Sequence, residues 1–178
     1  MSTNLEFINK TTITEGVTTV NVDNVFSTNY DVYYCQILGL FHDLDVSNGI
    51  EGIRFIDSSG SVITASEYAY AVLILKASAS STDTTRSTSA NYLNMNIFTD
   101  QLSDSGGGNL GFYVFNPYDS STYTFTKSQE AGQNSADFYG HKAIGCHKSA
   151  ETIRGFQLYE SNAARTFGGG KINVYGVK

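Results

Sequence analysis

The sequence predicts an all-β fold, an antiparallel β-sandwich of jelly-roll or similar Greek-key type with little helix. Three observations support this prediction. Charged residues make up only 16% of the chain, which disfavours long salt-bridged helices. Aromatic residues make up 13%, as 12 Tyr and 11 Phe, and these residues together with Thr suit half-buried strands. Apolar side chains recur with a period of two rather than 3.6.

The length predicts a single domain over residues 1–178, because domains typically hold about 100–200 residues. Hydrophobic residues make up 40% of the chain, which is too apolar for a disordered protein. A chain of this size can therefore build a core without disulfides or metals.

About ten short strands are expected along the chain. The candidate segments are residues 5–8, 18–22, 30–38, 52–56, 69–76, 92–98, 110–116, 122–126, 142–147, 153–159 and 171–177. In the last segment Ile172 and Val174 share one face, as in a strand with one side on the core. The breaks carry turn residues, such as Ser47-Asn48-Gly49 and Gly168-Gly169-Gly170. The best helical stretch, residues 127–136, is short and contains Gly132.

Residues 77–90 differ from the rest because they contain no large apolar side chain. Such a segment cannot pack a core. It is therefore predicted to be a long polar loop within the single domain, either mobile or docked on a neighbour.

Charge argues against nucleic-acid and membrane partners. The net charge is −6, and the 11 Lys and Arg are scattered without a run of three, whereas phosphate binding needs a basic patch. An anionic membrane surface is disfavoured for the same reason. The chain opens Met1-Ser2-Thr3-Asn4 without a signal-peptide pattern, and its longest apolar run is too short for a membrane helix. Synthesis in a cytoplasm without secretion is expected.

The two cysteines are Cys35 and Cys146, each inside an apolar run. Free Cys is among the most buried residue types, so two buried thiols are expected. A disulfide between them is the alternative, although a disulfide framework would need more pairs.

The densest group of polar residues contains Asp43, Asp45 and Glu51, whose oxygens could bind Ca²⁺. The EF-hand template fails here, because it requires Gly and Glu where this chain has Asn48 and Arg54. A solvated loop with turn-stabilising side chains is the expected structure, and calcium binding is a weak alternative.

His141, Cys146 and His147 form the second group, with ligand types that suit zinc. On a strand, however, the two histidines would point to one face and Cys146 to the other, which argues against a shared metal ion. No Gly-x-Ser-x-Gly elbow is present, and Gly170-Lys171 lacks the rest of a phosphate-binding loop. The sequence therefore predicts no catalytic residues, no cofactor and no enzymatic activity.

A frame of short motifs spans most of the chain. Its parts are Tyr30-Asp31-Val32-Tyr33, Ile53-Arg54-Phe55 followed by Ser58-Ser59-Gly60-Ser61, Asn116-Pro117, Gly155-Phe156-Gln157-Leu158, and the ending Gly170-Lys171-Ile172-Asn173-Val174-Tyr175-Gly176-Val177-Lys178. This frame resembles small β-sandwich virion proteins of tailed bacteriophages, notably those of aquatic hosts. The resemblance implies a non-enzymatic structural protein on the particle exterior, in a tail fibre, another tail component or a capsid decoration. It brings no catalytic residue with it.

The implied partners are other virion proteins, including copies of the same chain. One alternative is a carbohydrate-binding sandwich that recognises host-surface glycan through exposed Tyr, with calcium held by the loop from Asp43 to Glu51. Another is an enzyme on a jelly-roll scaffold that uses His141 or His147. Sandwiches host all three functions, so the fold class does not choose among them.

Overall fold

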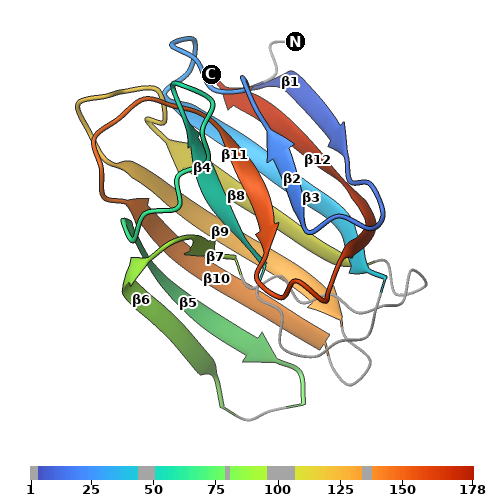
Figure 1. Cartoon of the computed structure of the whole chain (residues 1–178). Coiled ribbons are helices and arrows are strands. Elements are labelled where there is room, and N and C mark those ends of the chain that lie inside the picture. The colour runs from blue at the N-terminus through green and yellow to red at the C-terminus, as the bar shows by residue number, and fades with distance from the viewer. Residues whose placement is uncertain (1–3, 44–50, 79–80, 96–106, 134–137) are drawn as a thin grey trace.

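The computed structural model describes residues 4–43, 51–78, 81–95, 107–133 and 138–178. These residues form twelve strands in two sheets, which confirms the predicted all-β sandwich (Figure 1). Every strand pair among them is antiparallel. No helix in this part of the chain could cross a membrane.

The larger sheet has eight strands. In spatial order they are β1 (Leu5–Thr12), β12 (Phe167–Val177), β3 (Val32–His42), β8 (Gly108–Phe115), β9 (Thr124–Gln133), β10 (Phe138–His147), β5 (Tyr68–Lys76) and β6 (Asp83–Ala90). The smaller sheet contains β2 (Thr19–Val22), β11 (Ile153–Glu160), β4 (Glu51–Asp57) and β7 (Leu93–Asn94). The chain crosses repeatedly between the sheets, so strands distant in sequence become neighbours (Figure 1).

The core lies between the two sheets, because alternate residues of each strand point inward. On β8 Leu110, Phe112 and Val114 are buried and the residues between them are more exposed. Aromatic rings fill the centre: Phe26 lies 4.7 Å from Tyr33 between ring centroids and 6.1 Å from Phe156. The inward alternation leaves the opposite side of the eight-stranded sheet facing solvent.

The prediction of a polar loop over residues 77–90 is wrong for most of that segment. Asp83–Ala90 forms β6, the edge strand that pairs with β5. The segment buries little, but an edge strand needs only backbone pairing on one side, and Thr favours extended backbone. The lack of large apolar side chains therefore indicated an edge position rather than a loop.

The weak helical stretch at residues 127–136 belongs to strand structure up to Gln133, since β9 runs Thr124–Gln133 with strict alternation of buried and exposed residues. The strand expected at 92–98 is reduced to β7, Leu93–Asn94, and residues 96–98 lie outside the described part. The remaining strands agree with the predicted segments, with ends displaced by a few residues.

Both cysteines are free thiols. Cys35 on β3 is buried as predicted, whereas Cys146 on β10 is only partly buried. Two strands separate β3 from β10 in the sheet, which places the two residues at least about 14 Å apart at a strand spacing of about 4.8 Å. A disulfide between them is therefore ruled out in this fold.

Candidate functional site: the outer face of the large sheet

The outer face is the side of the eight-stranded sheet that points away from the four-stranded sheet. Strand register aligns one residue from each of the eight strands on this face in a single row. This outer row is Phe7, Tyr175, Tyr34, Tyr113, Lys127, Ile144, Ala71 and Arg86, from β1 to β6 in spatial order. None of its members is buried. The row thus crosses the whole sheet and divides into an aromatic half and a hollowed half.

The aromatic half covers β1, β12, β3 and β8. The ring centroids of Phe7 and Tyr175 are 5.8 Å apart, and those of Tyr175 and Tyr34 are 6.3 Å apart. Tyr34 and Tyr113 follow at 4.9 Å. Phe7 is 58% exposed and Tyr113 is 39% exposed, so these rings form a continuous aromatic strip that solvent still reaches.

Gly111 on β8 holds part of this strip in place. A Cβ atom at Gly111 would lie 2.6 Å from the hydroxyl oxygen of Tyr34, so the glycine leaves the space in which the Tyr34 ring lies flat. Gln36 Nε2 donates a long hydrogen bond, 3.5 Å, to the same hydroxyl. The Tyr34 ring is therefore positioned by the neighbouring strand as well as by its own.

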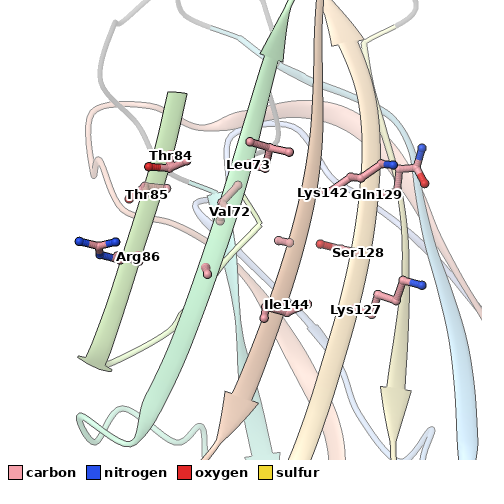
Figure 2. A pocket seen from close by; sticks show the side chains of 12 residues that line it. Val72, Leu73, Thr84, Thr85, Arg86, Lys127, Ser128, Gln129, Lys142 and Ile144 are labelled. Atoms are coloured by element: carbon pink, nitrogen blue, oxygen red, sulfur yellow. The ribbon is translucent and has the colours of Figure 1, made fainter. Parts of the chain in front are cut away.

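The hollowed half covers β9, β10, β5 and β6. A hollow of about 420 Å³ lies there, with Ala71 and Leu73 of β5, Ile144 of β10 and Lys127 of β9 among its lining residues (Figure 2). A second hollow continues from it and shares Ala71, Arg86 and Ile144. The small side chain of Ala71 leaves the space between the larger side chains of the strands on either side.

Three cations surround the first hollow. Lys127 and Lys142 extend from the β9–β10 side, and Arg86 lies on the β6 side (Figure 2). None of the three forms an ion pair with another residue in the described part of the chain. The hollow therefore combines apolar walls with positive charge, which suits an acidic partner.

The weak calcium candidates are not brought together in the described structure. Asp43 follows β3, and Thr166 Oγ1 donates a hydrogen bond to its carboxylate. Asp45 lies outside the described residues, and Glu51 is placed only as the first residue of β4. The calcium hypothesis for Asp43, Asp45 and Glu51 remains untested.

The predicted geometry of His141, Cys146 and His147 is found on β10. Both histidines are buried on the inner side, and Cys146 lies on the outer side. A ring nitrogen of His141 forms a short contact with the carboxylate of Glu130 on the neighbouring strand. Burial lowers the pKa of His141 to about 4, so this imidazole is neutral at pH 7.

A second buried histidine lies at the same end of the sandwich. His42 Nε2 is 3.2 Å from Glu160 Oε2, and Arg165 Nη1 is 3.7 Å from the same oxygen. Burial lowers the pKa of His42, against the opposing effect of Glu160. These side chains are almost completely enclosed, so they offer no access to a substrate in this structure.

The outer row was missed from the sequence. Exposed Tyr residues were expected as a possible recognition surface, but Phe7, Tyr34, Tyr113 and Tyr175 are separated by dozens of residues. Only the pairing register reveals that they lie in one line. The alternation of each strand was the available signal for which face each residue occupies.

Comparisons with known proteins add little. No protein-family model matches the chain, and no curated protein matches it. One similar solved structure is a human SPRY domain, with 12% identity, 94% of this chain and 96% of that chain covered, and a TM-score of 0.20. Another is the CBM2 module of the evolved Dit of Lactobacillus casei BL23 phage J-1, with 10% identity, coverage of 90% and 69%, and a TM-score of 0.23. Similarities this low carry no argument about function.

Proposed function

We propose that the chain is a non-enzymatic structural protein on the exterior of a tailed-bacteriophage virion, and that it acts through contacts between subunits made by its outer face. The observation that carries the proposal is the outer face itself, a broad sheet surface with exposed apolar side chains. The motif frame from Tyr30 to Lys178, which resembles phage virion sandwiches, supplies the biological setting.

The outer face has the size of a stable interface. Eight strands about 4.8 Å apart and about eight residues long, at about 3.3 Å per residue, give a surface of about 1,000 Å². A stable protein–protein contact buries about 800 Å² on each partner. One outer face is therefore large enough to hold a neighbouring subunit without help from the loops.

The apolar side chains of the outer face are unusually open to solvent. Ile144 is 64% exposed, Phe7 is 58% exposed and Phe125 is 50% exposed. Contiguous exposed apolar surface of this kind marks interaction sites in otherwise well-packed proteins. Lys127, Lys142 and Arg86 add positive charge beside it, while the chain carries a net charge of −6. A neighbouring subunit that presents acidic side chains to this face is thus an electrostatically suitable partner.

The mass of the purified chain as a function of concentration tests this proposal. We expect light scattering after gel filtration to show a defined oligomer, and Ile144→Glu to shift it to the monomer by placing a charge in the interface. Tyr118→Glu is the matched control, because Tyr118 is 39% exposed in a turn away from the outer face. A wild-type monomer at all concentrations, or equal effects of both variants, would contradict assembly through this face.

The virion setting needs a separate experiment. Antibodies against the purified chain should label the surface of intact particles of the phage that encodes it. Electron microscopy with a gold-conjugated secondary antibody would show this labelling. Absence of the chain from purified particles, measured by mass spectrometry, would refute the virion assignment while leaving self-association unaffected.

A second candidate function is binding of host-surface glycan, and the aromatic strip favours it. Exposed Tyr and Phe rings in a line offer flat apolar faces with polar rims, which suit the faces of sugar rings. We expect Tyr113→Ala to weaken binding to host polysaccharide. Tyr118→Ala is the matched control, since both tyrosines are 39% exposed. Titration with and without a chelator would separate calcium-assisted binding from stacking alone, and equal binding by both variants would exclude the strip.

A further inference from the structure

A cluster of three metal-ligating side chains lies away from the outer face. Glu67 directly precedes β5, His147 is the last residue of β10, and Glu151 lies in the connection from β10 to β11. One ligand atom from each side chain, an imidazole nitrogen or a carboxylate oxygen, lies within 4.8 Å of the others. Three separate chain segments therefore bring their donor atoms to one point.

The imidazole is held in a fixed orientation at this point. The His147 side chain is fully buried, with its ring centroid 5.0 Å from that of Tyr68 and 6.0 Å from that of Phe55. Tyr68 is itself fixed, because its hydroxyl donates to the Ile63 carbonyl at 3.0 Å and accepts from the Phe55 amide at 3.0 Å. His147 thus presents its ring edge to the two carboxylates without freedom to turn away.

The cluster leaves polar groups without partners in the described part of the chain. His147 Nε2 lies 2.9 Å from Glu151 Oε1, but the buried Nδ1 atom has no hydrogen-bond partner there. The Glu67 carboxylate forms no ion pair or hydrogen bond with a described residue. The nearby ammonium of Lys148 donates to the Thr88 carbonyl instead. Two carboxylates that converge on one imidazole, with no cationic side chain between them among the described residues, favour a cation from outside the chain.

The donor set selects the kind of partner. Two carboxylates close together repel each other, and a divalent cation between them removes this repulsion. An imidazole nitrogen beside two carboxylate oxygens suits borderline ions such as Zn²⁺, whereas Ca²⁺ prefers oxygen ligands alone. Zinc binds such atoms at about 2.0–2.2 Å, which holds them about 3–3.5 Å apart. The half-buried Glu67 and Glu151 side chains need move only about 1–2 Å to reach that geometry.

We propose that Glu67, His147 and Glu151 bind a divalent transition-metal ion, and that Zn²⁺ is the ion that best suits these ligands. The ion ties the start of β5 and the end of β10 to the connection that leads to β11. β5 and β10 belong to the large sheet and β11 to the small one. Bound metal therefore holds the two sheets in a fixed relative position at this end of the sandwich. Three protein ligands leave one position of a tetrahedral ion for a water molecule.

Zinc titration of the full chain tests the proposal after treatment with a chelator and its removal. We expect isothermal titration calorimetry to report one Zn²⁺ per chain, and a hundredfold excess of Zn²⁺ over its dissociation constant to raise the melting temperature by about 5–10 °C. Glu67→Gln and Glu151→Gln preserve side-chain size, and each should weaken binding by at least about tenfold. His147 is too buried for its replacement to be informative by itself.

Two control variants separate this site from other zinc binding. Glu15→Gln changes an exposed carboxylate elsewhere and should leave the titration unchanged. Cys146→Ser removes the thiol next in sequence to His147, which faces the other side of the sheet, and should also leave it unchanged. No detectable Zn²⁺ binding, undiminished binding by the Glu67→Gln/Glu151→Gln double variant, or loss of binding in Cys146→Ser would overturn the proposal.

Discussion

At the scale of single residues, the contact between Tyr34 and Gly111 controls the aromatic strip. In Gly111→Ala the new methyl group would lie 2.6 Å from the Tyr34 hydroxyl oxygen, so the ring must move. We expect the free energy of unfolding to fall by less than about 1 kcal/mol, because the exposed end of Tyr34 can shift into solvent. A crystal structure of the variant should show the 4.9 Å contact between Tyr34 and Tyr113 broken. An unmoved ring would contradict the positioning role of Gly111.

His141 makes the stability depend on pH. Burial lowers the pKa of His141 to about 4, from the ordinary value of 6.5 that applies in the unfolded chain. Between these values the unfolded state binds more protons, so the free energy of unfolding decreases as the pH falls from about 6.5 to about 4. The expected decrease is about 3 kcal/mol, since one pKa unit corresponds to about 1.4 kcal/mol.

Urea unfolding at pH 7 and pH 4.5 measures this dependence. The lowered pKa of His42 contributes with the same sign, so wild type must be compared with His141→Gln, which should show the shallower pH dependence. Glu130 contacts His141 from β9 and remains in both proteins. Equal pH dependence of the two proteins would show that His141 does not titrate in this range.

At the scale of elements, the small sheet depends on a close approach at Gly155 of β11. A Cβ atom there would lie 2.3 Å from the Val22 carbonyl oxygen and 2.9 Å from the Cα atom of Asp23, and backbone atoms cannot move aside cheaply. We expect Gly155→Ala to lower the free energy of unfolding by about 3 kcal/mol. Gly16→Ala is the control: its φ of 83° adds strain of about 1–2 kcal/mol, but nothing lies within 4 Å. Urea unfolding of both variants should rank them in this order.

Strands with clear alternation were predictable, and the exceptions have physical causes. Ile172 and Val174 identify the core face of β12 because a half-buried strand repeats every two residues. β6 lacks that signal, because this edge strand is held by backbone hydrogen bonds to β5 and buries few of its side chains. β9 was only partly predicted because its buried residues include Thr126, Ser128 and Glu130, which do not look like core residues in a sequence.

At the scale of the whole molecule, the outer face could not be derived from the sequence. Alternation assigns Tyr34 and Tyr113 to a face, but their adjacency depends on the pairing of β3 with β8 and on the register of that pair. The metal-ligating cluster could not be derived from the sequence for the same reason, because Glu67 reaches His147 only through the pairing of β5 with β10. Topology is set by long-range packing, which short motifs do not encode.

The cationic side chains of the outer face make association of the chain sensitive to salt. Lys127, Lys142 and Arg86 attract acidic groups of a partner, and raising the salt from 0.1 M to 1 M shortens the screening length from about 10 Å to about 3 Å. We therefore expect light scattering to show weaker association of the wild-type chain at 1 M NaCl. Lys127→Ala/Lys142→Ala should associate weakly at both salt concentrations. Stronger wild-type association at high salt would indicate that apolar contact alone drives assembly.

The edge position of β6 has a further consequence for how copies can meet. Among the described residues β6 pairs with β5 on one side only. Its sequence from Asp83 to Ala90 is rich in Thr and Ser and carries two charged residues, Asp83 and Arg86. Charges on an edge strand discourage uncontrolled backbone pairing with other chains. The β6 edge of the sheet is thus protected against fibrillar aggregation, which leaves the broad outer face as the surface for attachment.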